Sequence, residues 1–426
     1  MHKDKKRMLL LGSSIWKDII AEYAANNNVE LLFAGNTPSD LDKIVKEYYR
    51  IDSTDREAMI PFIRSLNVDG VFMGGSELII SHACEYLNEM GFPCYCNKEQ
   101  WELCQNKQAF KNMCRQYGVP CVPEFSQDDD PSTYDYPIIV KPTDSCSAKG
   151  ITVCYTPDEY KKAIGHALEY STEKRFIIEK FIENKGATMS IKYIIVDGEP
   201  YLEAVGDRYV LDSNQGKALI TAAAFYPSKY IDLYIRTVDE KVKAMFKGIG
   251  LKNGALFLEA IGNPDGIWFY EMGLRISGGQ TYKITEKTCG INELKMLLNH
   301  ACTGRMCEKE DIEKINPYLN GYYSASLTIP LREGVIGKIE GLNAVKEIPE
   351  TGVIVQYWKE GDEVLPKHIS TLEQLFCRIP VIVKGKDSLA SIMLTIKKHL
   401  SVKDKQGKEM IIWSKFDEIY NDFILK

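Results

Sequence analysis

Short apolar runs alternate with longer amphipathic stretches over the first hundred residues. The runs are four to six residues long, which suits buried strands, and the stretches between them repeat apolar positions at helical spacing. Strands and helices in alternation indicate a parallel α/β unit, which we expect to span residues 1–97. The predicted strands are 8–11, 29–34 and 69–73, and the predicted helices are 15–25 and 77–90.

Small residues follow the first and third of these predicted strands. Gly12-Ser13-Ser14 and Gly74-Gly75-Ser76 stand at strand ends, where parallel sheets bind ligands. The first turn lacks the G-x-G-x-x-G spacing of a dinucleotide site. We therefore expect both turns to line a cleft for a small substrate.

The pattern changes after residue 97 to a mixture of helices and paired strands. Residues 98–120 read as one helix with Lys107 near its middle, and Tyr136–Pro142 (YPIIVKP) reads as a buried strand ending in Lys141. We expect a second unit over 98–315, with a mobile lobe at about 122–178. The other predicted elements are helices at 157–170, 230–248 and 291–302, strands at 151–155 and 176–182, and a hairpin at 189–205.

A second predicted hairpin, at 256–275, carries two glutamates. It reads LFLEAIGNPDGIWFYEMGLR, with turn chemistry at Asn263-Pro264-Asp265-Gly266. If the loop has an odd number of residues, Glu259, Glu271 and Arg275 share one face, because side chains alternate along a strand. Two carboxylates that close repel unless a cation lies between them, and Mg²⁺ carrying nucleotide phosphates is the usual solution. The alternative is a surface hairpin with solvated acids.

Residues 316–426 form the last predicted unit. Short strands, repeated glycine turns and a helix at 388–400 indicate an α+β unit.

Composition narrows the class of protein. The chain has 45% hydrophobic and 26% charged residues and a net charge of −6, with its basic residues dispersed, so we expect neither nucleic acid nor a membrane as a partner. No apolar run approaches the roughly 20 residues of a membrane span. The twelve cysteines are scattered and form no C-x-x-C pair, which predicts a reduced, cytoplasmic protein.

The strand ending in Lys141 is followed by a loop of small residues, Ser145–Gly150, and then by another strand. Lys141 would place a point charge at the end of a rigid strand, and backbone N–H groups around Ala148–Gly150 would close over phosphate oxygens. A plain hairpin with a flexible tip is the alternative.

The order of these features resembles the ATP-grasp superfamily of carboxylate–amine ligases, and within it the branch of carbamoyl-phosphate synthase large-subunit halves, biotin carboxylase and L-amino-acid ligases. The resemblance covers nearly the whole chain. It implies an α/β and α+β fold, with a pre-ATP-grasp domain, a two-lobed ATP-grasp core and a C-terminal domain. The features in order are Lys107, Lys141 in VKP, the loop SCSAKG, IIEKFIE at 177–183, Glu259, and Glu271-x-Gly-x-Arg275.

The resemblance also implies roles for the matched residues. Lys107 and Lys141 would contact ATP phosphates, and Arg275, with Lys141, would act on the transferred phosphate and the acyl intermediate. Glu259 and Glu271 would hold one or two Mg²⁺ ions, for which Mn²⁺ can substitute. The mobile phosphate loop would include Ser147, Ala148, Lys149 and Gly150, and the adenine hinge would be Glu179-Lys180-Phe181-Ile182, through the Lys180 carbonyl and the Ile182 N–H.

Two positions depart from the family pattern. Gly273 stands where the family usually has an asparagine ligand, so a second Mg²⁺ would be bound more weakly or be completed by water. Thr188 stands where a ribose-binding glutamate is common, and a hydroxyl can still hydrogen-bond a ribose.

The resemblance implies a ligase that activates a small carboxylate, such as an amino acid, as an acyl phosphate for attack by an amine. Such chemistry needs positioning and electrostatics rather than a protein nucleophile. Two alternatives stay open: a bicarbonate-using enzyme of the carbamoyl-phosphate or carboxylase type, and a non-catalytic ATP-binding regulator. A homodimer is also left open. The substrate cleft would lie between the turns at 12–14 and 74–77, the segment at Asp207-Arg208, and Arg275–Gly278. Arg208 could clamp a carboxylate there, although the default interpretation is a surface arginine.

Overall fold

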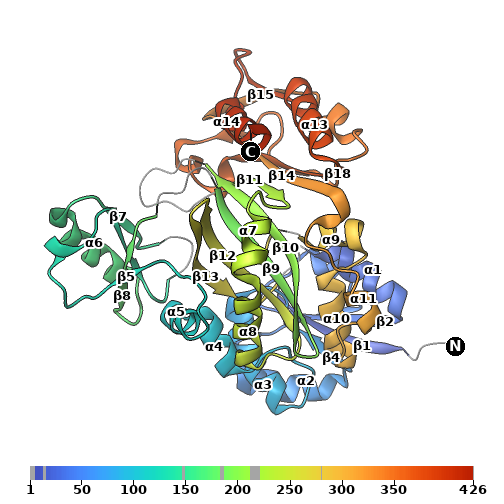
Figure 1. The fold of residues 1–426 in the computed structure, drawn as a ribbon. Helices are drawn as coiled ribbons and strands as arrows, with labels where there is room; N and C mark the ends of the chain where they lie inside the picture. Colours follow the sequence, from blue (N-terminus) through green and yellow to red (C-terminus); the bar gives the residue numbers. More distant parts are fainter. Residues whose placement is uncertain are drawn as a thin grey trace.

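The computed structural model describes residues 5–12, 16–145, 149–182, 187–211, 221–279 and 281–425 of the 426-residue chain. Within these residues the strands form four sheets, and helices pack on and between them (Figure 1). Mixed α/β architecture agrees with the sequence prediction. No helix among the described residues is long and apolar enough to cross a membrane.

The first sheet has the strand order β3-β2-β1-β4, and its strands are parallel. This agrees with the predicted α/β unit, although β3 and α2 were not predicted. The two central strands, KRMLLL and VELLFAG, are mostly apolar because both faces of the sheet are covered there. The strands are β1 (Lys6–Leu11), β2 (Val29–Gly35), β3 (Glu47–Arg50) and β4 (Gly70–Phe72), and the helices are α1 (Lys17–Asn27), α2 (Arg56–Leu66) and α3 (Glu77–Glu89).

The single helix predicted at 98–120 is wrong, because two helices meet there. These are α4 (Lys98–Gln105) and α5 (Lys107–Gln116). Asn106 has extended backbone angles, and its side-chain oxygen accepts hydrogen bonds from the backbone N–H groups of Gln108 and Ala109, both at 3.0 Å. This is an N-cap, which starts a new helix. Lys107 is therefore the first residue of α5 rather than the middle of a long helix.

A four-stranded sheet, in the order β5-β8-β6-β7, forms a lobe that stands to one side of the molecule (Figure 1). The lobe has its own apolar core, in which Ile138, Val140 and Ile178 pack against Tyr160 and Ala163 of α6. It contains β5 (Glu124–Phe125), β6 (Ile138–Pro142), β7 (Thr152–Cys154), β8 (Phe176–Lys180) and α6 (Pro157–Glu169).

The largest sheet has eight strands, in the order β13-β12-β9-β10-β11-β14-β18-β16. Its first five strands precede residue 316 and its last three follow it, so one sheet continues across the predicted boundary of the third unit. The strands are β9 (Ala187–Val196), β10 (Glu199–Val210), β11 (Thr221–Tyr226), β12 (Gly254–Asn263), β13 (Gly266–Gly273), β14 (Tyr322–Pro330), β16 (Val355–Gln356) and β18 (Leu375–Lys384).

Helices cover the inner part of this sheet. The helix predicted at 230–248 is divided at Val238 into two, and the second of them lies across β9 and β10 (Figure 1). Another helix, α10, joins the eight-stranded sheet to the N-terminal one by packing on β1, β4 and β12. The helices are α7 (Ile231–Thr237), α8 (Asp239–Ile249), α9 (Thr281–Cys289), α10 (Glu293–Thr303) and α11 (Lys309–Ile312).

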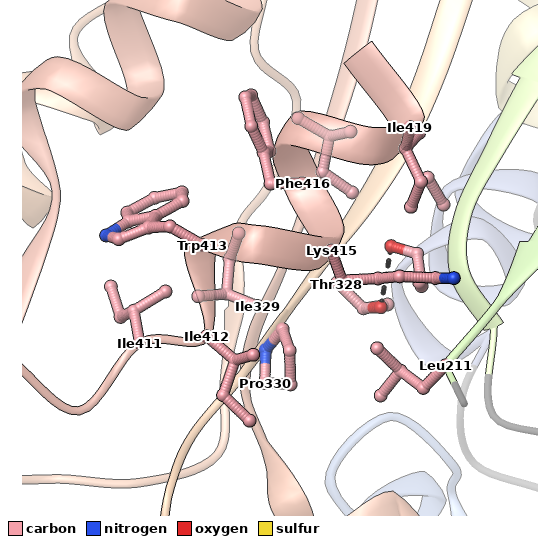
Figure 2. Close-up of a pocket in the computed structure, with 13 residues that line it drawn as sticks. Leu211, Thr328, Ile329, Pro330, Ile411, Ile412, Trp413, Lys415, Phe416 and Ile419 are labelled. Carbon is pink, nitrogen blue, oxygen red and sulfur yellow. Dashed lines mark hydrogen bonds between the residues drawn. The ribbon is translucent and has the colours of Figure 1, made fainter. Parts of the chain in front are cut away.

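The C-terminal part adds a small antiparallel sheet, in the order β17-β15-β19, and three helices. The last helix packs Trp413, Phe416 and Ile419 over β14, above an apolar hollow (Figure 2). The Thr328 hydroxyl in that hollow donates to the carbonyl of Ala222 at 2.9 Å, so its hydrogen bond is already made within the protein. We therefore interpret the hollow as part of the packing between the last helix and the sheet, and not as a ligand site. The elements are β15 (Gly334–Glu340), β17 (Glu363–Val364), β19 (Ser401–Asp404), α12 (Leu342–Lys346), α13 (Lys386–His399) and α14 (Trp413–Leu425).

Candidate active site

Glu259 on β12 and Glu271 on β13 lie directly opposite each other, on one face of the eight-stranded sheet. The loop of this hairpin has two residues, so the odd-numbered loop that would align the two glutamates is not what brings them together. A β-bulge supplies the missing residue: Ala260 pairs with Phe269 and Glu259 with Glu271, which leaves Tyr270 as the extra residue. The bulge therefore places the two carboxylates on a common face.

Glu259 is buried and held from two sides. Its Oε1 accepts a hydrogen bond from the Ser190 hydroxyl of β9 at 3.1 Å, and its Oε2 lies 3.1 Å from Nη2 of Arg208 on β10. The contact of Oε2 with Arg208 is an ion pair without hydrogen-bond geometry. Glu271, in contrast, is exposed. One carboxylate is thus fixed by its neighbours, and the other faces outward from the sheet edge.

Arg208 spans the face between these strands. Its Nε donates to the Thr188 hydroxyl at 3.3 Å, and its Nη2 donates to the Tyr270 hydroxyl at 3.3 Å. The Thr188 hydroxyl in turn donates to the backbone carbonyl of Arg208 at 3.3 Å. Thr188, predicted as a ribose ligand, is therefore engaged by Arg208.

Arg275 follows β13 and reaches the N-terminal unit. Its Nε and Nη2 donate to one carboxylate oxygen of Glu77, at 2.9 and 2.7 Å, and Glu77 begins α3 directly after the turn at 74–76. The guanidinium also lies over the ring of Phe257, with Cζ 4.9 Å from the ring centre. The structure thus brings together Arg275 and the turn that the sequence assigns to the same cleft.

Gly273 lies opposite Phe257 in the hairpin. A Cβ at this position would stand 2.3 Å from two carbons of the Phe257 ring. No side chain fits there without displacing the ring, which explains in physical terms why glycine stands where the family pattern has asparagine.

Lys141 belongs to a buried ion-pair network in the lobe. Its Nζ lies 2.7 Å from the Glu179 carboxylate, and the same carboxylate pairs with Lys111 of α5. Lys111 also donates to the carbonyl of Val122 at 3.1 Å. Burial alone would raise the pKa of Glu179, but the charges of Lys141 and Lys111 outweigh it and hold the pKa below its ordinary value. The Glu179 side chain therefore positions the predicted phosphate lysine.

Sequence reasoning missed Lys111. It is fully buried, and it lies one turn after Lys107 on the same helix, a spacing that could have indicated a shared face. Lys107 itself donates to the carbonyl of Ser145, at the start of the predicted phosphate loop, at 2.8 Å. The structure thus brings both predicted phosphate lysines to the lobe.

The predicted phosphate loop is described only in part. Ser147 and Ala148 lie outside the described residues, while Lys149 is exposed and Gly150 is buried. Gly150 has φ +74°, and a Cβ there would meet Pro142 and Tyr170, so the turn requires glycine.

The predicted adenine hinge joins the lobe to the rest of the molecule. The backbone N–H of Lys180 donates to the Pro123 carbonyl at 2.9 Å, and that of Phe181 donates to the Pro137 carbonyl at 3.0 Å. Ile182 follows and is half-buried.

A buried charged cluster beside the carboxylate face was also missed. Lys192 of β9 lies 4.8 Å from the centre of the Phe257 ring, and burial lowers its pKa to about 8. Burial likewise raises the pKa values of Glu203 and Glu293. The Glu203 carboxylate accepts from the Thr285 hydroxyl at 2.9 Å. Apolar neighbours in the sequence gave no signal for these groups, because burial of a charge depends on the tertiary fold.

Comparison with known proteins shows which family model and which folds this chain resembles. Residues 104–250 match the family model described as D-ala D-ala ligase C-terminus. The L-amino acid ligase from Bacillus licheniformis superimposes with a TM-score of 0.75 at 18% sequence identity, over 94% of this chain and 99% of that one. The chain has an ATP-grasp fold.

A second solved structure and a curated relative extend this comparison. The biotin carboxylase domain dimer of Hydrogenobacter thermophilus 2-oxoglutarate carboxylase, solved with MgADP, ADP and bicarbonate, superimposes with a TM-score of 0.70 at 17% identity, over 95% of this chain and 91% of that one. The phosphoribosylamine–glycine ligase of Methanopyrus kandleri is 26% identical over 236 residues, which are 51% of this chain and 48% of the relative. The chain therefore spans about half the length of that curated relative.

The carboxylates of Glu259 and Glu271 are suitable ligands for a divalent cation. Two carboxylates face each other, and no hydrogen bond or ion pair holds the exposed Glu271 carboxylate among the described residues. Hard oxygen donors of this kind are preferred by Mg²⁺.

Proposed function

We propose that this protein is an ATP-dependent carboxylate–amine ligase. It would activate a small carboxylate, such as an amino acid, as an acyl phosphate, which an amine then attacks with release of phosphate. The observation that carries the proposal is the direct pairing of Glu259 with Glu271 on a face that continues to Arg275. The named ligases among its relatives, and the ADP and magnesium of a structural neighbour, support it.

Each group of residues has a task in this proposal. Lys141 from the lobe and Lys107 from α5 would neutralise phosphate charge, and Glu179 keeps Lys141 in place. Glu259 and Glu271 would hold Mg²⁺, which when bound would neutralise phosphate oxygens. The hinge residues from Glu179 to Ile182 would receive adenine at their backbone.

Arg275 is the group we assign to the transferred phosphate and the acyl group. A guanidinium offers a planar fork that matches both a phosphate and a carboxylate. Its present partner, Glu77, comes from the N-terminal unit, whose strand ends would line the pocket for the carboxylate substrate. Binding of an anionic group to Arg275 would therefore compete with Glu77.

Two alternatives give different experimental results. A bicarbonate-using enzyme would share the nucleotide site, and the bicarbonate in one structural neighbour is the reason to test it. A non-catalytic regulator would bind ATP without turnover. A homodimer, the state named for that same neighbour, is tested by the mass of the protein in solution.

Phosphate release from ATP–Mg²⁺, measured with each amino acid singly, in pairs and with bicarbonate, tests the proposal. We expect release to depend on an amino acid together with an amine, and ATP–Mg²⁺ alone to raise the melting temperature by mass action. Release with bicarbonate alone would favour the carboxylase alternative. Stabilisation without release under any condition would favour the regulator, and no stabilisation at millimolar ATP–Mg²⁺ would refute nucleotide binding.

The lobe is expected to close when nucleotide binds. It has a separate core and a separate sheet, and it is joined to the body through Pro120–Val122, which pairs with Phe269 of β13, and through the hinge after β8. Closure would exclude water from an acyl phosphate. Hydrogen exchange with and without an ATP analogue should show added protection in peptides covering Lys141 and Gly150. Unchanged exchange there, with protection elsewhere, would contradict the lid assignment.

A further inference from the structure

We propose that Arg208 takes the place of a second metal ion, so that the site holds one divalent cation with the nucleotide. The inference rests on the proposed function, because it concerns the metal requirement of the same site. It comes from three contacts of one guanidinium and from one position that cannot supply a metal ligand.

The Arg208 guanidinium lies among three side chains of the carboxylate face. Nη2 lies 3.1 Å from Glu259 Oε2 and 3.3 Å from the Tyr270 hydroxyl, and Nε lies 3.3 Å from the Thr188 hydroxyl. The side chain of Glu259 is 8% exposed and that of Arg208 is 29% exposed, so water screens this pair only in part. A fixed positive charge therefore already neutralises the inner carboxylate.

The second observation concerns the backbone that holds these groups. Tyr270 is the extra residue of the bulge, and it reaches the Arg208 guanidinium on the face that Glu259 and Glu271 share. The same bulge thus aligns the two carboxylates and gives the guanidinium a neutral acceptor. The guanidinium is therefore held in place by its contacts with Glu259, Tyr270 and Thr188.

Position 273 supplies no oxygen ligand for a second metal ion. Gly273 follows Glu271 by two positions on the same face and carries no side chain, and the Phe257 ring fills the space where one would extend. The Ser190 hydroxyl next to Glu259 already donates to that carboxylate. A second ion would have to share the carboxylates of Glu259 and Glu271, would gain no ligand from position 273, and would lie beside a guanidinium.

Two charges of the same sign cannot be held close together in a partly buried site without a large cost. A divalent ion at Glu259 Oε2 and the guanidinium of Arg208 are such a pair. One ion would be held by the outward-facing Glu271 and by Glu259 Oε1. The fixed guanidinium would then be the second positive group that faces the nucleotide phosphates.

Counting Mn²⁺ ions tests this inference without any assay of turnover. The full-length protein is titrated with Mn²⁺ in the presence of saturating AMP-PNP, a non-hydrolysable ATP analogue, and free Mn²⁺ is measured by electron paramagnetic resonance. We expect one bound Mn²⁺ per chain in the wild type beyond any bound to free nucleotide. We expect Arg208→Met to bind a second Mn²⁺ at least tenfold more tightly than the wild type does, and Arg208→Lys to keep one.

The matched control is Arg305→Met. Arg305 is an exposed arginine that pairs with Glu308 at 2.7 Å on the surface, and its loss should leave the stoichiometry at one. Two ions of similar affinity in the wild type would overturn the inference while leaving the proposed function in place, and this result needs no variant to fold. An Arg208→Met protein that binds Mn²⁺ as the wild type does would also overturn it. No Mn²⁺ bound with AMP-PNP would refute the nucleotide site itself.

Discussion

Glu271→Gln is expected to lower kcat at saturating ATP by on the order of a hundred- to a thousandfold, the range seen when one electrostatic contact to a transition state is removed. Glu271 is exposed, and no hydrogen bond or ion pair fixes it among the described residues. Its charge is therefore available to a metal ion, and an amide cannot replace it. Steady-state phosphate release with the substrates found in the screen measures the effect.

Glu259→Gln is expected to lower kcat less. Its amide oxygen can still accept from Ser190, and Arg208 still supplies a positive charge beside it. Asp265→Asn is the matched control, because Asp265 is an exposed carboxylate at the tip of the same hairpin. Near-wild-type kcat in both glutamate variants would mean that the pair is only a solvated face of the hairpin.

Glu179→Gln is expected to destabilise the protein by about 3–5 kcal/mol, the usual cost of removing one partner from a buried ion pair. The side chains of Lys111 and Lys141 are 0% and 7% exposed, and both would lose the charge that offsets their burial. Urea unfolding monitored by circular dichroism measures the free energy of unfolding. Glu240→Gln, in which the lost carboxylate is 85% exposed, is the control and should change it by less than about 1 kcal/mol.

The pH dependence of this difference has a defined sign. The pKa of Glu179 is lower in the folded protein than its ordinary value of 4.5, so its contribution to stability is complete above that value. The contribution is lost as the pH falls through the folded-state pKa, because the carboxylate becomes protonated. The difference between wild type and Glu179→Gln should therefore shrink on acidification below about pH 4.5. A difference that stays constant or grows would contradict the ion-pair role.

Features that depend on local sequence patterns could be predicted. The strand ending in Lys141, the two strands around the Asn263–Gly266 turn and the alternating N-terminal unit all follow from periodicity and turn residues. The break between α4 and α5 was missed, because Asn106 is a cap only if its side chain turns back to the next helix. The bulge at Tyr270 was missed as well, since no residue type there marks it.

The contacts that define the candidate site could not be read from one sequence. Lys111 with Glu179, Arg208 with Glu259, and Arg275 with Glu77 each join elements that are distant along the chain, the last pair being 198 residues apart. Such pairs depend on how sheets and helices stack, and every one of these residues has ordinary surface roles in other folds. The sequence could therefore indicate the chemistry of the site but not the partner of each charge.

The eight-stranded sheet has a mechanical consequence. Backbone hydrogen bonds run without interruption from β13, which carries Glu271, through β11 and β14 to β18 in the last hundred residues. The carboxylate strands and the C-terminal part must then travel as one rigid body, because separating them would break a ladder between central strands. We therefore expect any opening that admits substrate to fall at the separate sheet of β5–β8. Lys141 would then move with that lobe, while the two acids, and Lys107 on α5, would stay with the body.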